Sequence, residues 1–466
     1  MPLRTCLVLY RATCCAIFVS GALSASDACA TPYLTLGPSD GIAVDQPRAT
    51  VAIVDPATQQ VLGPEFSNTF LLDTGANDIL VGGDAYSELQ DAGYQTVAQY
   101  DDFGIGGTAT MDVSKAYEFD FAGDNGVPIA LPNTRVLSNA SADLGFDGVL
   151  GMPAMVGRTV NVDMTPWSGG NFDTLKTSFT STAPPVVANQ YHVPLSLVDF
   201  PPTGQHNPGD PLPTFAPLSM APVVVQNQTH QLNGNFIVDT GAQISIISTA
   251  TALALGIDPV KDAVDSLDLS GIAGTVNVPI VNVDSLGLKT SEGVNLMWTG
   301  LQVGVYDIDP NIAGVFGMDF LTSGWLNALL GGGPDGYLNG VHFDFRNAQN
   351  HAGTMVLDVN PTLSHVLVPG DTTQDGIVNG LDVNAIASHW LHMGSALPGD
   401  ANGDGIVNGL DINLVASNWL AHVPGHGTGT AVPEPGTRTL AGTCCTVLWG
   451  LRWRTRRHGR TLTSGR

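Results

Sequence analysis

The sequence predicts a mainly β protein whose body consists of two copies of one module, followed by a small α-helical module. The chain of 466 residues contains 55 Gly and 30 Pro, and only 13% of its residues are charged. Frequent turns between apolar segments are typical of many short strands rather than of helix bundles. The other two observations are internal repeats, one that spans the body and a shorter one near the C-terminal end.

The body is strongly acidic and has no cysteine. The net charge is −25, and between residues 31 and 437 there are eight Lys and Arg against 41 Asp and Glu. Such a surface repels phosphate, so we expect no nucleic-acid partner. All six Cys lie near the two ends of the chain. The body therefore has no disulfide of its own to stabilise it. Its stability must come from apolar cores, with or without a bound metal.

The N-terminal segment is typical of a secretory signal peptide. Residues 1–30 contain Arg4 and Arg11, then an apolar run, and end with Ala-Cys-Ala at positions 28–30. Small residues at this spacing suit a signal peptidase, so we expect an exported protein whose mature chain starts at Thr31. The alternative is a short buried helix.

The C-terminal segment, residues 425–466, contains Val-Pro-Glu-Pro at positions 432–435, a short apolar stretch and an Arg-rich tail. This combination resembles the PEP-CTERM sorting signal. The resemblance implies export in a Gram-negative-type bacterium, transient membrane association through this segment, and a location at the cell surface or outside the cell. The alternative is a disordered basic tail.

Three motifs occur once in each copy of the body. The separation in sequence between Asp73 and Gly148 equals that between Asp239 and Gly314. Three motifs in one order at near-constant spacing indicate a duplication. Residues 70–76 return as 236–242, residues 104–108 as 271–275, and residues 148–152 as 314–318.

Each copy places Asp-Thr-Gly at the end of an apolar strand. Residues 68–72 and 235–238 are rich in apolar, β-branched or aromatic side chains, and an Asn-Gly pair at 233–234 predicts a hairpin turn before the second strand. Paired carboxyl groups suit acid–base chemistry such as amide hydrolysis, which needs a base to activate water and an acid to protonate the carbonyl oxygen and the leaving nitrogen. Two carboxyl groups about 3 Å apart share one proton and supply both roles. Asp73 and Asp239 are therefore the candidate catalytic pair.

These motifs resemble those of the aspartic proteases. Each copy also has the later apolar-apolar-Gly motif; residues 146–151 look pepsin-like, and residues 314–321 look retropepsin-like. The resemblance spans residues 45–350 and implies a bilobal aspartic-protease fold of two pseudo-twofold-related β lobes, which we assign to residues 31–185 and 186–365. It also implies an aspartic endopeptidase that acts on a peptide or protein substrate, with no cofactor for catalysis.

The resemblance also assigns supporting residues. It implies that Thr74 and Thr240 hydrogen-bond across the pseudo-twofold axis, and that Gly75 and Gly241 let backbone N–H groups approach the carboxylates. A flap hairpin closes over the substrate in this family, and we expect the first lobe rather than residues 271–275 to supply it. The alternative is an ordinary glycine-rich turn. The expected flap residues are Gly104, Ile105, Gly106, Gly107 and Thr108.

The chain departs from the pepsin pattern beside each motif. Ala76 and Ala242 follow the motif glycines, and Asn77 and Gln243 stand where pepsins carry Ser or Thr. A hydroxyl that donates to an ionised carboxylate lowers its pKa. Without such hydroxyls we expect a mildly acidic to near-neutral working range.

A second repeat, in residues 371–420, predicts two calcium loops. Each copy has carboxylates at loop positions 1, 5 and 12 and glycine at position 6, which is ligand spacing for Ca²⁺. Apolar residues at helical spacing then predict helices that reach residues 391 and 420. Thr373 makes the first loop weaker than the second, which has Asn402 at the same position. The candidate ligands are Asp371, Thr373, Asp375, Ile377, Asn379 and Asp382 in the first loop, and Asp400, Asn402, Asp404, Ile406, Asn408 and Asp411 in the second.

Two loop–helix units in tandem resemble a type I dockerin, and we assign this module to residues 366–424. The resemblance implies bound Ca²⁺ and a cohesin-like partner. Two alternatives stay open for this part of the chain: a Ca²⁺-stabilised surface module with no such partner, and acidic glycine-rich turns.

Two other functions compete with a general peptidase. The lobes could be a non-catalytic scaffold at the cell surface, with the dockerin-like module as the working part. The catalytic pair could also serve only self-processing. The presence of both aspartates favours the peptidase.

Overall fold

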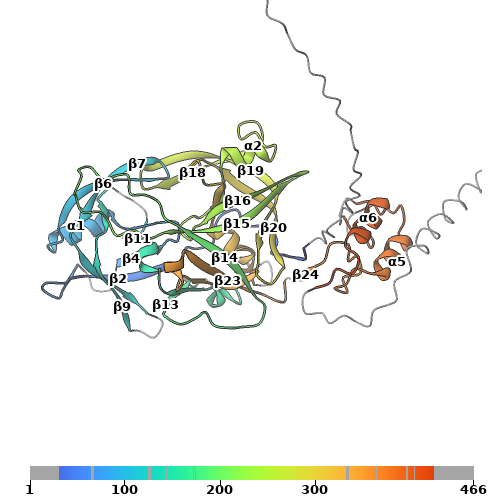
Figure 1. Cartoon of the computed structure of the whole chain (residues 1–466), viewed down its shortest axis with the longest axis horizontal. Helices are drawn as coiled ribbons and strands as arrows, with labels where there is room; N and C mark the ends of the chain where they lie inside the picture. Colours follow the sequence, from blue (N-terminus) through green and yellow to red (C-terminus); the bar gives the residue numbers. More distant parts are fainter. Residues whose placement is uncertain are drawn as a thin grey trace, which may run out of the picture. The chain divides into compact units, whose positions relative to one another are not determined.

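Figure 1 shows the computed structural model of the chain, which describes residues 31–63, 68–123, 127–141, 145–171, 173, 175–331, 335–363, 366–394, 397–402 and 405–423. The signal peptide expected at 1–30, the sorting segment expected at 425–466 and the candidate ligand Asp404 lie outside the described residues. Within the described ranges no helix is long and apolar enough to cross a membrane. The described chain is mainly β, as predicted.

The first lobe is built on one mixed sheet. Its strands run in the order β6-β7-β10-β5-β11-β4-β2-β8-β9, and β3 pairs with β2. Helix α1 follows β5 directly and buries Ala85, Tyr86 and Leu89. The elements are β2 (Arg48–Asp55), β3 (Gln60–Leu62), β4 (Asn68–Leu72), β5 (Ile79–Gly82), α1 (Gly83–Asp91), β6 (Thr96–Gly104), β7 (Gly107–Ser114), β8 (Tyr117–Ala122), β9 (Pro128–Thr134), β10 (Leu137–Asn139) and β11 (Gly148–Leu150).

The second lobe repeats this arrangement. Its sheet contains the order β14-β15-β16-β21-β17-β20-β1-β24, and β19 pairs with β15, β18 and β20. The elements are β14 (Gln190–Val198), β15 (Leu218–Asn227), β16 (His230–Val238), β17 (Ile246–Ile247), α2 (Thr249–Ala254), β18 (Ala263–Gly271), β19 (Gly274–Lys289), β20 (Asn295–Val305), β21 (Gly314–Phe316), α3 (Met318–Leu321), α4 (Trp325–Leu329), β22 (Leu338–Asp344), β23 (Ala352–Val359) and β24 (Val366–Leu367).

The repeated motifs occupy the same place in both lobes. Strand β11 lies parallel to β4 and antiparallel to β5, just as β21 lies parallel to β16 and antiparallel to β17. Gly148 lies against the ring of Phe70, and Gly314 against the ring of Phe236, so that a Cβ at either glycine would collide with the ring. Both phenylalanines are fully buried. The glycine of each later motif is therefore a packing requirement of the strand that carries Asp-Thr-Gly.

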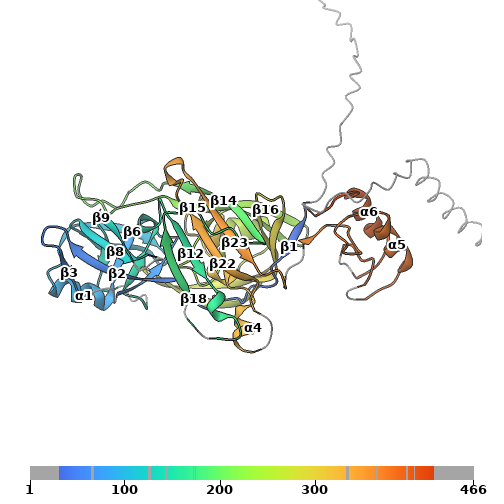
Figure 2. The ribbon, with the colours of Figure 1, turned by 90° about the horizontal axis from the view of Figure 1, so that it is seen from below.

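Strands from both lobes pair to join them. Strand β12 (Thr159–Asp163) of the first lobe pairs antiparallel with β22 of the second, and β13 (Lys176–Thr180) and β23 continue the sheet on either side. Figure 2 shows β12, β22, β23 and β14 side by side between the lobes. Strand β1 (Tyr33–Thr35) lies in the span expected for the first lobe, but it pairs with β20 of the second lobe. It also pairs with β24, which lies at the start of the span expected for the small module and extends the second-lobe sheet instead.

The hairpin turn predicted at 233–234 is wrong. Asn233 and Gly234 lie inside β16, and the chain reverses instead between β15 and β16 at Gln228, which has φ of +51°. The side chain of Asp284 accepts a hydrogen bond from the Gln228 amide and fixes this turn. A Cβ at position 234 would collide with Ala313, which accounts for a glycine within this strand.

The small module contains α5 (Gly380–Ser388) and α6 (Gly409–Ser417). Its core fully buries two equivalent pairs of residues, one member of each pair from each repeat: Val378 with Val407, and Ile386 with Val415. Both helices end before the predicted positions 391 and 420. Leu391 and Leu420 adopt positive φ, and their amides donate to Val407 and Val378 across the module. These cross-bonds take the place of another helical turn.

Candidate active site

Each Asp-Thr-Gly loop starts where its strand ends. Asp73 directly follows β4, and its amide donates to the Leu150 carbonyl of β11 at 3.1 Å. Asp239 directly follows β16, and its amide donates to the Phe316 carbonyl of β21 at 3.0 Å. The strand pair in each lobe therefore holds the backbone of its aspartate in the same way.

Thr74 and Thr240 hydrogen-bond across the pseudo-twofold axis. The Thr74 hydroxyl donates to the Val238 carbonyl at 2.6 Å and accepts from the Thr240 amide at 3.1 Å. The Thr240 hydroxyl donates to the Leu72 carbonyl at 2.6 Å and accepts from the Thr74 amide at 3.1 Å. Both side chains are fully buried. These four bonds fix the two aspartate loops relative to each other.

The two aspartates face each other across this lock. A Cβ at Gly75 would collide with the carboxyl group of Asp239, and one at Gly241 would collide with that of Asp73. The Gly75 amide donates to Asp73 Oδ1 at 2.7 Å, and the Gly241 amide donates to Asp239 Oδ1 at 2.8 Å. Each motif glycine thus supplies a donor to its own lobe and leaves space for the carboxyl of the other.

The pair is arranged to carry one proton. Burial and then the charge of Asp239 raise the pKa of Asp73 well above its ordinary value. Burial also raises the pKa of Asp239, while hydrogen bonds from Asp73 and from the Gly241 and Ala242 amides lower it. Two carboxyls this close cannot both ionise cheaply, which favours a single proton shared between them.

Each lobe has a glycine-rich hairpin at the repeated motif. Strands β6 and β7 turn at Ile105 and Gly106, and β18 and β19 turn at Ile272 and Ala273. The Ala273 amide donates to the Ile105 carbonyl at 3.3 Å, so the tips meet. Figure 1 shows the two hairpins running toward each other along the same side of the body. The flap expected from residues 104–108 of the first lobe is therefore one of two matched hairpins.

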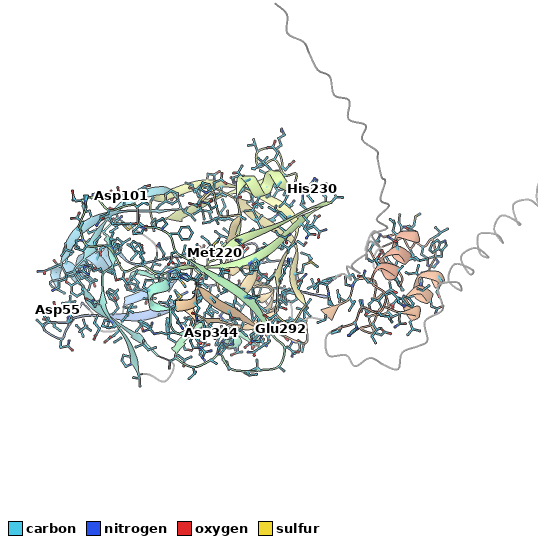
Figure 3. The ribbon with its side chains drawn as sticks, in the orientation of Figure 1. Asp55, Asp101, Met220, His230, Glu292 and Asp344 are labelled. Atoms are coloured by element: carbon cyan, nitrogen blue, oxygen red, sulfur yellow. The ribbon has the colours of Figure 1, made fainter. Side chains whose placement is uncertain are left out.

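The segment between β14 and β15, residues 199–217, covers the outer edge of β6. The Asp101 amide donates to the Gly204 carbonyl at 2.8 Å, and the Asp101 carboxylate (Figure 3) pairs with His206 at 2.7 Å. Further along, the Ala216 amide donates to the Asn77 carbonyl at 2.8 Å, beside the first motif. A surface pocket next to this segment, lined in part by Gln99 and His206, contains no motif residue.

Gln46 is a supporting residue that sequence reasoning missed. It is 7% exposed, donates through Nε2 to the Gly241 carbonyl, and accepts from Gln243 Nε2 at 2.9 Å. The Gln243 side chain therefore points to Gln46 rather than to the Asp239 carboxylate. No motif contains Gln46, and only the crossing of the N-terminal segment to the second lobe brings it there.

Asp319 is a second missed residue. Ser245 donates to Asp319 Oδ1 at 2.7 Å and accepts from the Gly317 amide at 2.8 Å. Burial raises the pKa of Asp319 to about 7. The equivalent positions of the first lobe are Ile79 and Pro153, which are both apolar. The buried hydrogen bond between Ser245 and Asp319 therefore has no counterpart in the first lobe.

The first predicted calcium loop brings oxygen atoms together. The Thr373 hydroxyl lies 3.2 Å from Asp371 Oδ1 and 3.0 Å from Asp382 Oδ1. Burial, and then the neighbouring charges of Asp382 and Asp375, raise the pKa of Asp371, although its hydrogen bonds from Gly376 and Thr373 oppose the rise. Carboxylates and a hydroxyl are oxygen donors of the kind that Ca²⁺ takes. Among the described residues, however, no three acidic, His or Cys side chains are grouped as a metal site, and Asp375 instead accepts the Ile377 amide.

Several candidate ligands also hold the helices. Asp382 and Asp411 are fully buried and accept the amides of Asn379 and Asn408, which are the N-cap residues of α5 and α6. The Asn379 side chain accepts from Leu381 at 2.8 Å and donates to the Ile377 carbonyl at 3.0 Å; Asn408 does the same with Leu410 and Ile406. In the second loop, Asp400 accepts the Gly405 amide at 2.8 Å, and the Asn402 amide donates to Asp411 at 3.1 Å.

Comparison with known proteins points to the same chemistry. The family model of aspartyl protease matches residues 221–320. This range contains Asp239 with its motif, the second hairpin and strand β21. No curated protein matches the chain. The second lobe is thus similar to aspartyl proteases, and the match supports an aspartic protease.

Proposed function

We propose that this chain is an exported aspartic endopeptidase in which Asp73 and Asp239 together activate water. One observation carries the proposal: two Asp-Thr-Gly loops, from two lobes, are locked together by reciprocal hydrogen bonds of their buried threonines. The pKa values of both carboxyls are raised. A scaffold that only displayed another module would need neither the lock nor the paired acids, so these features favour an enzyme.

The reaction follows from one proton held between two carboxyls. The ionised carboxyl takes a proton from a water molecule, and the resulting hydroxide attacks the peptide carbonyl carbon. The protonated carboxyl donates its proton to the carbonyl oxygen, giving a neutral tetrahedral diol. A proton then passes to the amide nitrogen, the C–N bond breaks, and the acid and amine products leave. The flap hairpins exclude bulk water during these steps.

We further propose that residues 366–424 form a Ca²⁺-stabilised module similar to a dockerin, with a cohesin-like partner. The oxygen atoms that meet at Thr373 and the two capped helices support this reading. The signal-like residues 1–30 and the sorting-like residues 425–466 support export to the cell surface or the medium.

The catalytic assignment predicts loss of activity on removing either acid. Asp73→Asn and Asp239→Asn should each lower kcat/KM on a fluorogenic peptide by about 10³-fold or more, because each removes the acid or the base. The double variant should be no worse than either single one, since the pair acts as a unit. Asp91→Asn, at an exposed end of α1, is the matched control and should retain full activity.

Circular dichroism and thermal melting show whether the variants fold. Clear activity in a folded Asp73→Asn or Asp239→Asn enzyme would contradict the assignment. Wild-type enzyme that cleaves no peptide, at any pH from 3 to 8, would favour the non-catalytic scaffold instead.

A further inference from the structure

Two hydrogen bonds fasten the second catalytic loop to the turn that follows β21. The Asp239 amide donates to the Phe316 carbonyl at 3.0 Å, at the start of the loop, and the Met318 amide donates to the Ala242 carbonyl at 2.9 Å, further along it. Equivalent bonds, at 3.1 and 2.9 Å, hold the first catalytic loop to the turn that follows β11. These two bonds are common to both lobes, so they do not make the two loops different.

A third fastening, at the end of the second loop, has no counterpart in the first lobe. The Ser245 hydroxyl accepts from the Gly317 amide at 2.8 Å and donates to Asp319 Oδ1 at 2.7 Å. A hydroxyl has one hydrogen, so its bond to Asp319 leaves its lone pairs for the Gly317 amide. Asp319 therefore fixes the orientation in which Ser245 binds the turn. Ile79 and Pro153 stand at the positions of Ser245 and Asp319 in the first lobe, and their side chains can make neither bond.

The glycine of the later motif leaves room for the Asp319 carboxyl. A Cβ at Gly317 would lie 3.0 Å from Asp319 Oδ1 and 3.0 Å from the Ala242 carbonyl oxygen. A Cβ at the equivalent Gly151 of the first lobe would collide instead with the backbone of its own loop, at the Asp78 carbonyl. The glycine of the second lobe is thus in close contact with the catalytic loop and with Asp319 together.

Asp319 lies where a carboxyl group is costly. Asp319 and Ser245 are fully buried, and among the described residues Asp319 Oδ2 has no hydrogen-bond partner. Burial raises the pKa of Asp319 to about 7, although hydrogen bonds from Ser245 and from backbone amides lower it. The acid is therefore mostly neutral in mildly acidic solution and bonds to Ser245 without placing a charge in the core. An apolar side chain would avoid the unpartnered oxygen, but it would leave the Ser245 hydroxyl without its acceptor.

We propose that Asp319 is a positioning residue for Asp239, which acts through the Ser245 hydroxyl and keeps the second catalytic loop oriented toward Asp73. The proposal rests on the proposed peptidase function and deepens it, because it makes the two catalytic loops unequal. The turn after β21 holds the loop of Asp239 at three places, whereas the equivalent positions of the first lobe supply two. Asp319 is buried behind the loop and takes no part in bond cleavage.

Kinetics of the full-length protein test this role. Asp319→Leu and Ser245→Ala should each lower kcat on a fluorogenic peptide by about 10²-fold and change KM by less than about 3-fold, because small misplacements of reacting groups have effects of this size on the chemical step. Asp319→Asn keeps an oxygen that accepts from Ser245 and should retain kcat within about 3-fold. The double variant Ser245→Ala with Asp319→Leu should lose no more than either single one, since the two residues act as one unit.

A control variant and unfolding measurements separate positioning from folding. Ser323→Ala removes a buried hydroxyl that donates to the Phe320 carbonyl at 2.8 Å within the same turn, and it should keep full activity. Denaturant unfolding shows the conditions in which each variant is folded, and kcat is compared there. A folded Asp319→Leu enzyme with full activity would overturn the proposal. So would Asp319→Asn as poor as Asp319→Leu, because the acid itself rather than its bond to Ser245 would then matter.

Amide hydrogen exchange examines the loop without using catalysis. In Asp319→Leu the amides of residues 239–245 and 314–319 should exchange about 10-fold faster or more than in the wild type, while those of residues 73–79 should change by less than about 2-fold. This result supports the positioning of the loop even if the wild type cleaves no peptide, in which case the proposed function alone fails. Unchanged exchange in residues 239–245 overturns the proposal, whatever the kinetics show.

Discussion

The residue after each motif glycine affects the pH at which the catalytic pair works. The Ala242 amide donates to Asp239 Oδ1 at 3.0 Å, but its side chain has no hydroxyl to add a second bond. Gln243 does not replace that hydroxyl, because its side chain is bonded to Gln46. Only backbone donors and the partner carboxyl therefore stabilise the ionised form of Asp239, against the burial that raises its pKa.

Ala242→Thr should move the acidic limb of the rate profile to lower pH. A threonine hydroxyl that donates to the Asp239 carboxylate favours its ionised form and lowers its pKa, so the base stays ionised in more acidic solution. The measurement is kcat/KM against pH for the wild type and the variant. Ala242→Val has nearly the same shape without the hydroxyl and should leave the limb in place. A wild-type maximum near pH 2–3, or equal limbs for Thr and Val, would rule out this explanation.

At the scale of single elements, helices α5 and α6 depend on the loops before them. Asp382 and Asp411 accept amides at the start of their helices and also end the predicted calcium loops. Bringing a cation to these oxygens would relieve the repulsion that Asp382 and Asp375 exert on Asp371. Loop and helix should therefore be stabilised together.

Calcium should raise the melting temperature of the module in the full-length protein. A ligand that binds only the folded state at 100 times its Kd adds about 2.7 kcal/mol to the free energy of unfolding. Isothermal titration should show two Ca²⁺ sites. The second loop should bind more tightly, because it has Asn402 at the position where the first loop has Thr373. Asp371→Ala should remove one site and Asp400→Ala the other, whereas Asp335→Ala should remove neither. No heat of binding and no change in melting would mean that the loops are acidic turns.

At the scale of the whole molecule, the features that could be predicted from the sequence are those encoded by neighbouring residues or marked by the repeat. Strands β4 and β16 end at the motifs as expected, because apolar patterning and Asp-Thr-Gly lie within a few positions of each other. The pairing of β12 with β22 and of β1 with β20 joins segments that are far apart in the sequence, and no short pattern specifies such a partner. The turn at Gln228 was missed for a similar reason, since Asp284 from another strand fixes it.

The candidate site also contains residues that the repeat marks and residues that it does not. Asp73, Asp239 and the two threonines were found because the duplication marks them twice in the sequence. Gln46 and Asp319 have no counterpart in the other lobe, so the repeat gives no signal for them. The resemblance favoured a flap from the first lobe alone, whereas hairpins of matched register occur in both lobes. Which hairpin closes over a substrate stays a prediction.

The threonine lock makes the two lobes depend on each other. Thr240→Val keeps the side-chain shape but leaves the Leu72 carbonyl without its donor and the Thr74 amide without its acceptor, both at a buried interface. Each unsatisfied buried group costs about 1–3 kcal/mol, so denaturant unfolding should show a loss of about 2–6 kcal/mol. Activity should fall by roughly 10²-fold as well, because small misplacements of reacting groups have effects of this size. Thr240→Ser retains the hydroxyl and should recover most of both quantities. If Val and Ser variants unfold and cleave alike, the hydroxyl bonds contribute little, and packing alone must hold the two aspartates together.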